Sequence, residues 1–402
     1  MHASGSRDSA ALREIFPVAV VTGARQTGKS TLVRRPELLP HHKYLTLDDV
    51  LLREEARRDP ELFLDRAARL VIDEVQHAPD LLFAIKRRVD ENRNRGRYVL
   101  TGSSNLLVQQ NVSESMAGRA GYVCLWPLSR REQLNLSTAG PWSEILDNKP
   151  EDWPGILEAQ ESSAEDWQAP ACRGGYPTPA YELERQDQRA EWLAGYADTY
   201  LERDLRQLSA IENLADMRRL MGALCHRLGG LLKQAEISRD LALPSSTVQR
   251  FLNLLEVSYQ LVRLPSYSVN RTRHLIKAPK TYWSDTGLAI FLASETEPRG
   301  VHLENLVLTD LLSWAGATRS RPNLLHWHTV TGAEVDFAVE LPDRLLPIEV
   351  KAAKRVGHRD ARHLLTFLDD YPEAPGALLI YSGNETFWID RRILAAPWHR
   401  VI

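Results

Sequence analysis

Nine residues near the start of the chain combine glycines, a lysine and hydroxyl groups at the spacing of a phosphate-binding loop. They run Gly23-Ala24-Arg25-Gln26-Thr27-Gly28-Lys29-Ser30-Thr31 and fit the pattern G-x-x-x-x-G-K-[ST]. The glycines let the backbone curl so that its N–H groups face a phosphate. Lys29 would reach the β- and γ-phosphates, and Ser30 would hold a magnesium ion. The sequence therefore predicts that these residues bind ATP together with Mg²⁺.

Two acidic residues end an apolar segment further along the chain. Residues 69–74 read RLVIDE, so Asp73 and Glu74 come directly after a run typical of a buried strand. Asp73 is expected to bind the magnesium shell, and Glu74 to orient or deprotonate the attacking water. The alternative, two solvated acids at a strand end, is disfavoured by the loop that precedes them.

Two further groups are candidates to sense or stabilise the γ-phosphate. A strand expected over residues 97–100 leads into a polar turn, in which Ser103, Ser104 or Asn105 would contact the phosphate. Arg119 would act as an arginine finger across a subunit boundary, which implies a homo-oligomer. The alternatives are a plain polar turn and an ion pair between Arg119 and a surface acid.

A second set of charged residues, near the carboxyl end, has the chemistry of a metal-dependent nuclease. Residues 332–340 and 347–351 are expected to form successive strands, and strand alternation places Glu349 and Lys351 on one face with Asp336 beside it. The two carboxylates would hold Mg²⁺ while Lys351 stabilises the attacking hydroxide or the developing phosphate charge. Glu304, on an upstream helix, would be a third metal ligand. The same spacing also occurs in ordinary β-hairpins.

Between these two sets, the sequence predicts a winged helix-turn-helix that binds DNA. Helices are expected over 217–228, 234–241 and 247–257, followed by strands over 259–264 and near 281–283. The residues expected to face a DNA groove are Ser246, Thr247, Gln249 and Arg250. The basic residues between the two strands, suited to phosphates, are Arg271, Arg273 and Lys277. Winged helices also dock proteins, so a protein partner is the alternative.

The elements that position these residues predict an α/β fold followed by two smaller units. Five strands alternating with helices indicate a doubly wound parallel sheet, with strands at 18–21, 43–47, 69–72, 97–100 and 121–126. The expected domains are an ATPase core (1–135), an insertion and helical linker (136–215), the winged helix (216–285) and a nuclease-like domain (286–402). Within the linker, the tryptophans and prolines of residues 141–170 are expected to cover the ATPase, and residues 181–208 to form one long helix.

The composition of the chain restricts the class of protein and the cellular compartment that we expect. The 402 residues include 50 Lys and Arg against 53 Asp and Glu, so any nucleic-acid surface must be local. Three scattered cysteines without a CxxC pair point to a reducing cytoplasm and no structural zinc. No apolar run approaches the roughly 18 residues of a membrane helix, and the first residues are too polar for a signal peptide. We therefore expect a cytoplasmic protein without a membrane partner.

Taken together, these motifs resemble those of a widespread prokaryotic family of AAA-type (AAA+) ATPases, fused to a winged helix and a C-terminal PD-(D/E)xK domain like the Holliday-junction resolvases and restriction endonucleases. The resemblance rests on GARQTGKSTL, LVIDEVQ, LTGSSNLL, SESMAGR, YLERDL, PKTYWSDTGL, GAEVDF and PIEVK. It implies a P-loop ATPase core, DNA contact through the winged helix, and a nuclease-like site at Glu304, Asp336, Glu349 and Lys351. Residues 141–170 depart from the family's pattern.

Two functions of different class follow from these patterns. The first is an ATP-hydrolysing protein that binds and processes duplex or branched DNA, with a possible metal-dependent nuclease site. The second is an ATP-dependent regulatory, toxin or defence protein whose carboxyl-terminal domains bind DNA or protein without cutting. A small-molecule kinase is disfavoured because Glu74 directly follows Asp73, as it does in enzymes that activate water.

Overall fold

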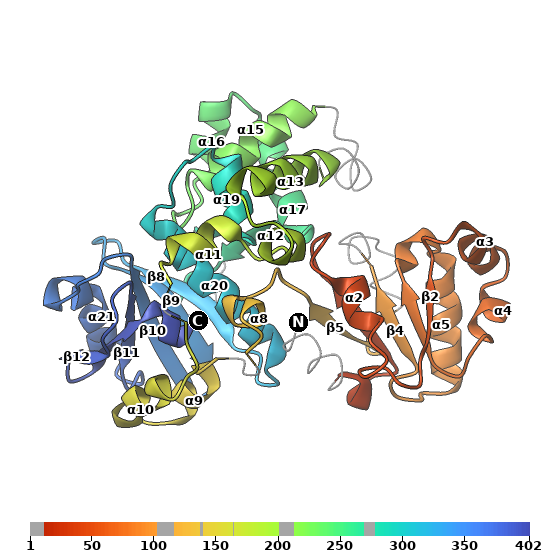
Figure 1. The fold of residues 1–402 in the computed structure, drawn as a ribbon, viewed down its shortest axis with the longest axis horizontal. Helices are drawn as coiled ribbons and strands as arrows, with labels where there is room; N and C mark the ends of the chain where they lie inside the picture. Colours follow the sequence, from red (N-terminus) through yellow and green to blue (C-terminus); the bar gives the residue numbers. More distant parts are fainter. Residues whose placement is uncertain (1–11, 103–115, 137–139, 164, 201–212, 269–277) are drawn as a thin grey trace.

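The computed structural model describes residues 12–102, 116–136, 140–163, 165–200, 213–268 and 278–402. These residues form three lobes (Figure 1). The amino-terminal lobe and the carboxyl-terminal lobe each contain a large sheet, and a mainly helical lobe lies above and between them. Within the described ranges, no helix combines the length and the hydrophobicity that crossing a bilayer requires.

The amino-terminal lobe is built on a parallel sheet of five strands, as the sequence predicts. The strands are β1 (Val18–Thr22), β2 (Lys43–Thr46), β3 (Leu70–Asp73), β4 (Tyr98–Thr101) and β5 (Ala120–Cys124). Their order is β2-β3-β4-β1-β5, so β1 is flanked by β4 and β5. Alternate residues of β1 pack into separate apolar clusters, because successive side chains of a strand point to opposite faces. Both faces of the sheet are therefore covered.

Short helices connect these strands. They are α2 (Lys29–Val33), α3 (Val50–Arg58), α4 (Pro60–Leu64), the 3₁₀ turn η1 (Val75–His77) and α5 (Asp80–Glu91). The chain after β2 forms two helices that meet at Asp59, whose side chain caps α4 while its backbone N–H donates to the last turn of α3. Helix α2 spans only 5 residues. It ends at Val33, three residues before Pro36, and proline disfavours helical geometry in the residue that precedes it.

The helical lobe follows the predicted order of elements, with one correction. It contains α11 (Gln168–Arg173), α12 (Pro177–Tyr181), α13 (Gln186–Thr199), α15 (Leu214–Cys225), α16 (Gln234–Leu241), α17 (Ser245–Val257), the antiparallel pair β6 (Leu261–Leu264) and β7 (Lys280–Trp283), and α19 (Thr286–Leu292). The single helix predicted over residues 181–208 is wrong at its start. Tyr181 ends α12, and Arg185 has an extended backbone, so α13 begins only at Gln186.

The carboxyl-terminal lobe is a mixed sheet between helices. Its strands are β8 (Asn323–His328), β9 (Glu334–Leu341), β10 (Arg344–Lys351), β11 (Ala377–Tyr381), β12 (Phe387–Asp390) and β13 (Ile393–Pro397), in the order β12-β13-β11-β10-β9-β8. Helix α20 (Gly300–Ala317) packs on one face and α21 (His358–Asp370) on the other, and α22 (Trp398–Val401) ends the lobe. The predicted strands form the antiparallel hairpin β9-β10.

The tryptophan- and proline-bearing segment does not cover the ATPase lobe as predicted. It forms α9 (Trp142–Asp147), the 3₁₀ turn η2 (Pro150–Asp152) and α10 (Trp153–Glu158), which lie beside the carboxyl-terminal sheet (Figure 1). Trp142, Trp153 and Trp167 share one apolar core with residues of α20, β9 and β10. Their large apolar area is buried against that sheet, which explains the placement.

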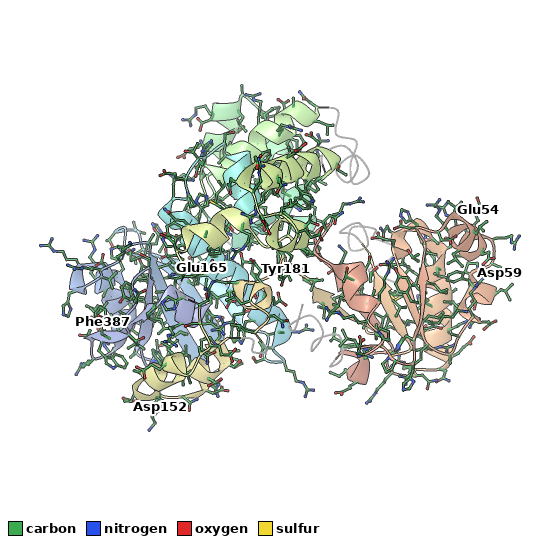
Figure 2. All side chains as sticks on the ribbon, in the orientation of Figure 1. Glu54, Asp59, Asp152, Glu165, Tyr181 and Phe387 are labelled. Atoms are coloured by element: carbon green, nitrogen blue, oxygen red, sulfur yellow. The ribbon has the colours of Figure 1, made fainter. Side chains whose placement is uncertain are left out.

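A short helix ties the amino-terminal chain to the other two lobes. Helix α8 (Arg130–Gln133) follows β5, and Arg130 donates a hydrogen bond of 3.0 Å to the backbone oxygen of Ile402. The hydroxyl of Tyr181, at the junction of the lobes in Figure 2, donates to the carbonyl of Glu132 at 2.7 Å. The segment after β5 is therefore anchored at both the carboxyl terminus and the helical lobe.

Candidate functional site

The predicted phosphate loop lies between β1 and α2 and has the backbone curl that such a loop requires. Gly23 has φ +135° and Gly28 has φ +90°, and Gln26 lies in the left-handed region at φ +63°. A Cβ atom at Gly23 would lie 2.2 Å from the carbonyl oxygen of Leu125, so only glycine fits there. The loop therefore has the backbone curl that lets its N–H groups face a phosphate.

Lys29 is folded into the loop. Its ammonium donates to the carbonyl oxygens of Gly23 at 3.1 Å and Ala24 at 2.6 Å, and the residue is 6% exposed. Burial lowers the pKa of Lys29, and the nearby carboxylate of Glu74 opposes that effect. An ammonium held by two carbonyls of the loop is placed to exchange them for phosphate oxygens, so the residues present fit a nucleotide.

The carboxylate of Asp73 accepts hydrogen bonds from hydroxyl groups on three different elements. Its Oδ1 accepts a hydrogen bond from Ser30 Oγ at 3.1 Å and another from the hydroxyl of Thr101. Its Oδ2 accepts from the hydroxyl of Tyr44 at 2.5 Å, and burial with this hydrogen bond raises the pKa of Tyr44 to about 12. The predicted pair of magnesium residues, Ser30 and Asp73, is therefore in direct contact.

Glu74 stands beside this group in an unusual backbone conformation. It has φ +58°, and its backbone N–H donates to Thr101 Oγ1 at 3.1 Å. Its carboxylate accepts a hydrogen bond from the side-chain amide of Gln76. A non-glycine residue held in the left-handed region at a strand end is a common feature of functional sites.

Thr101 and Tyr44 were not singled out by the sequence analysis. Thr101 ends β4, which is adjacent to β3, and the carboxyl ends of parallel strands meet at one edge of a sheet, so strand order identifies it. Tyr44 is the second residue of β2 and lies opposite Val71, so only the length of its side chain brings its hydroxyl to Asp73. The predicted sensor residues Ser103, Ser104 and Asn105 lie outside the described residues.

Arg119 has the surface ion pair that the sequence analysis left open as an alternative. Its guanidinium donates two hydrogen bonds to the carboxylate of Asp90 on α5, at 2.6 and 2.9 Å. In this arrangement the side chain is bound within its own subunit, and a finger role requires it to leave Asp90.

The helical lobe contacts the phosphate loop directly through two tyrosine hydroxyls. The hydroxyl of Tyr259 donates to Thr22 Oγ1 at 2.9 Å, at the end of β1, and its ring packs edge-on against Trp126. The hydroxyl of Tyr196 on α13 lies 3.4 Å from the carbonyl oxygen of Arg25 in the loop. Gln260 donates to that same tyrosine hydroxyl at 3.0 Å, so both contacts lead to the chain that follows α17.

Helix α17 has the buried and exposed faces that its spacing predicts. Val248, Phe251, Leu252 and Leu255 are buried, whereas Ser246 and Arg250 are exposed and Thr247 and Gln249 are half-buried. Its start is fixed to α16, because the amide of Gln234 donates to the carbonyl of Ser245 at 2.7 Å. The basic residues Arg271, Arg273 and Lys277 lie outside the described residues.

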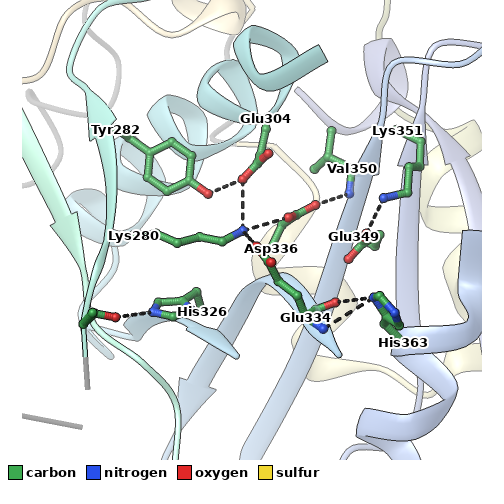
Figure 3. A network of polar contacts seen from close by, with 11 residues as sticks. Lys280, Tyr282, Glu304, His326, Glu334, Asp336, Glu349, Val350, Lys351 and His363 are labelled. Carbon is green, nitrogen blue, oxygen red and sulfur yellow. Dashed lines mark hydrogen bonds and ion pairs between the residues drawn. The ribbon is translucent and has the colours of Figure 1, made fainter. Parts of the chain in front are cut away.

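The second candidate site brings together all four predicted residues of the carboxyl-terminal lobe and adds two charged residues that were not predicted, Lys280 and Glu334 (Figure 3). Lys280, from β7 of the helical lobe, places its ammonium 3.0 Å from Asp336 Oδ1 and 3.4 Å from Glu304 Oε1. It also pairs with the carboxylate of Glu334. The other oxygen of Asp336 accepts from the backbone N–H of Val350 at 2.9 Å.

Glu349 and Lys351 lie on one face of β10, as strand alternation predicts, and their side chains pair with each other. Burial and the nearby Asp336 raise the pKa of Glu349, and the same two causes raise the pKa of Glu304. Burial disfavours the charge of Lys280, but Asp336 and Glu304 outweigh it, so its pKa lies above the usual range. The cluster therefore contains two lysines among its acids.

This arrangement does not fit the predicted magnesium ion as the side chains stand. Among the residues that the structure describes, no group of three or more histidine, cysteine, aspartate or glutamate side chains is placed to share a metal ion. A lysine ammonium already bridges Asp336 and Glu304. The sequence did contain a sign that Lys280 has a special role, because this lysine stands in the segment KTYW (residues 280–283), which otherwise has the composition of a buried strand.

Comparisons with known proteins divide the chain as follows. A family model described as an AAA domain matches residues 16–134. A model described as Domain of unknown function (DUF8612) matches residues 164–299, and one described as Domain of unknown function (DUF4143) matches residues 299–401. The AAA domain thus covers the whole parallel sheet and α8.

Relatives match over nearly the full length. The chain is 31% identical to the Mycobacterium tuberculosis protein Rv2008c over 412 aligned positions, covering 98% of this chain and 84% of that protein. A Haemophilus influenzae protein is 20% identical over 88% of this chain and 87% of its own length.

Solved structures with detectable similarity are more distant. The Walker-type ATPase PABY2304 of Pyrococcus abyssi is 15% identical, with a TM-score of 0.43, over 71% of this chain and 94% of that one. The RuvB Holliday junction branch migration motor of Thermotoga maritima is 16% identical, with a TM-score of 0.28, over 68% and 92%.

Proposed function

This chain belongs to the family of the Mycobacterium tuberculosis protein Rv2008c and is an AAA-type ATPase, and we propose that ATP controls how it binds and processes DNA. When bound with the nucleotide, magnesium would supply positive charge to the phosphates, and Ser30 and Asp73 are the residues that would hold it. Lys29 would leave its two loop carbonyls for phosphate oxygens, which requires only a rotation of a side chain already inside the loop.

Hydrolysis in this proposal depends on the water that Glu74 orients. Thr101 holds the backbone of Glu74 and the carboxylate of Asp73 through one hydroxyl, so it is a positioning residue for both. Arg119 would assist from a neighbouring subunit of a homo-oligomer once it leaves Asp90.

The observation that carries the coupling to DNA is the pair of hydrogen bonds between the loop region and the helical lobe. Tyr259 contacts Thr22 at the start of the loop, and Tyr196 contacts Arg25 within it. Phosphate binding that moves the loop must break or shift these bonds, and Tyr259 lies two residues after α17. A movement of the phosphate loop on nucleotide binding would therefore be passed through Tyr259 to α17, the helix proposed to bind DNA, because Tyr259 lies only two residues after this helix in the chain.

DNA is the proposed partner because α17 has the exposed amino-terminal side chains of a recognition helix. Ser246 and Arg250 project from a helix whose opposite face is buried, and α16 precedes it by a turn that is pinned through Gln234. In helix-turn-helix proteins such amino-terminal residues contact base edges. Arg271, Arg273 and Lys277, in the chain between β6 and β7, are proposed to contact phosphates.

For the carboxyl-terminal lobe, the first hypothesis is strand cleavage by Asp336, Glu349 and Lys351. The second is that this lobe binds DNA or a protein without cutting, as a regulatory or defence component would. One observation favours the second hypothesis, namely that the Lys280 ammonium pairs with Asp336 and Glu304. Incubation of DNA with the protein and Mg²⁺ or Mn²⁺ distinguishes them, because cleavage that is lost in Asp336→Ala supports only the first.

The DNA proposal is tested by fluorescence anisotropy of labelled duplex, single-stranded and four-way-junction DNA, with ATP and with ADP. Arg250→Glu is expected to weaken binding by about ten-fold or more, since it turns a groove contact into a repulsion. Arg185→Glu is the matched control, because this exposed arginine lies at the start of α13 and pairs only locally with Asp187. Equal affinities of the two variants and the wild type would overturn the role of α17.

A further inference from the structure

Lys280 reaches the carboxylate cluster of the carboxyl-terminal lobe from a different lobe. It begins β7, whereas Glu304 lies on α20 and Glu334 and Asp336 lie on β9. The residue is 1% exposed, and its ammonium reaches the three carboxylates from the side opposite to Lys351 (Figure 3). A buried lysine with three acidic partners is a permanent charge of the interior rather than part of a solvated surface.

The backbone of β7 fixes this lysine in place. Asn305 on α20 accepts a hydrogen bond from the N–H of Trp283 at 2.9 Å and donates one to its carbonyl at 2.8 Å. Tyr282, two residues along the same strand, donates its hydroxyl to Glu304. Hydrogen bonds therefore hold the strand that carries Lys280 against the helix that carries Glu304, one residue from that acid.

The ammonium lies where a divalent ion would have to bind. Magnesium or manganese would need oxygens of Asp336 and Glu304 at about 2.1 Å, in the volume between the two carboxylates. The Lys280 nitrogen is 3.0 Å from one and 3.4 Å from the other, so it fills that volume. The second carboxylate oxygen of Asp336 accepts a hydrogen bond from the backbone N–H of Val350. A metal ion and the ammonium cannot occupy the cluster together.

We propose that Lys280 is an internal cation that takes the place of a divalent metal ion between Glu304 and Asp336 and blocks a metal site made by these two acids and Glu334. The third acid supports this proposal, because the carboxylate of Glu334 pairs with the same ammonium. Removal of the ammonium would free these three carboxyl groups, which are the kind of ligand that Mg²⁺ and Mn²⁺ prefer. The proposal is independent of whether α17 binds DNA.

Manganese binding to the full-length protein without nucleotide tests the proposal, with free Mn²⁺ followed by electron paramagnetic resonance. The wild type and Asp336→Asn are expected to bind Mn²⁺ equally, because the cluster takes up none. Lys280→Met is expected to gain one site at least about ten-fold tighter than any in the wild type. The double variant Lys280→Met/Asp336→Asn is the matched control, in which the phosphate loop is intact and the new site is lost.

Two results would overturn the proposal. The first is a Mn²⁺ site in the wild type that disappears in Asp336→Asn, since the ammonium would then not exclude the ion. This comparison needs no Lys280 variant, so it decides the question even if Lys280→Met does not fold. The second is a Lys280→Met protein with the gel-filtration profile of the wild type that gains no site. A melting temperature of Lys280→Met that rises with Mn²⁺, against no rise in the double variant, would support the proposal.

Discussion

The contact between Tyr259 and the start of the phosphate loop allows a direct test of communication between the lobes. Tyr259→Phe removes one hydroxyl and leaves the ring against Trp126. The lost hydrogen bond to Thr22 is 2.9 Å long, and Thr22 keeps its own bond of 3.2 Å to the carbonyl of Val123. No buried partner is therefore left unsatisfied.

The size of the effect follows from the hydrogen bond that is removed. A neutral hydrogen bond contributes about 1 kcal/mol net, which corresponds to about five-fold in an equilibrium. If that bond transmits the nucleotide state, the stimulation of ATP turnover by DNA should fall by up to about five-fold in Tyr259→Phe. The contact between Tyr196 and Arg25 remains, so some coupling should persist.

The assay measures phosphate release with and without saturating DNA for the wild type, Tyr259→Phe and Tyr267→Phe. Tyr267 is the matched control because its hydroxyl lies 3.5 Å from Glu373, on the carboxyl-terminal lobe and away from the loop. Stimulation in Tyr259→Phe equal to that of the wild type would refute the claim that this bond carries the coupling.

Three further predictions concern single side chains. Lys29→Ala should abolish ATP turnover, because the only ammonium inside the loop among the described residues is lost, and undiminished phosphate release would remove the loop from the mechanism. Thr101→Val keeps the shape of the side chain but loses the hydroxyl that holds Asp73 and Glu74, so kcat should fall by about ten-fold or more with a smaller change in KM for ATP; an unchanged kcat would contradict this positioning role. Burial raises the pKa of Asp310 to about 6 from 3.8, so the folded protein holds a proton that the unfolded chain releases and the free energy of unfolding falls as pH rises from about 4 to 6. Asp310→Asn can still accept the hydrogen bond from Trp142. In urea denaturation, its free energy of unfolding relative to the wild type should rise by about 2 kcal/mol between pH 4 and pH 8. A constant difference in the free energy of unfolding across this range would show that Asp310 does not titrate in this way.

The phosphate loop could be predicted because its chemistry is local. The glycines, Lys29 and Ser30 lie within one short stretch of the chain. The residues before this stretch are typical of a strand and those after it of a helix, as a phosphate-binding loop requires. The contact between Ser30 and Asp73 also follows, since the loop that leads to Ser30 leaves the carboxyl end of β1 and Asp73 ends β3 of the same parallel sheet. The pairing of Glu349 with Lys351 needed only the period of a strand.

Features that depend on which surfaces pack together could not be predicted from local patterns. Trp142 and Trp153 read as a segment rich in aromatic and proline residues, and nothing in their spacing says which of two sheets buries them. Thr101 became visible as a site residue only when β4 was placed next to β3. Lys280 lies 56 positions before Asp336, in a strand of another lobe, and its role follows from the docking of β7 on α20.

The central claim is that nucleotide binding at the phosphate loop is coupled to DNA binding at α17. It is tested most directly by the rate of ATP hydrolysis in the presence of duplex, single-stranded and four-way-junction DNA. The account predicts that at least one form raises the rate in the wild type and that Arg250→Glu reduces this stimulation. A rate that is the same without DNA and with every form would contradict the account, and would direct the search to a protein partner for α17.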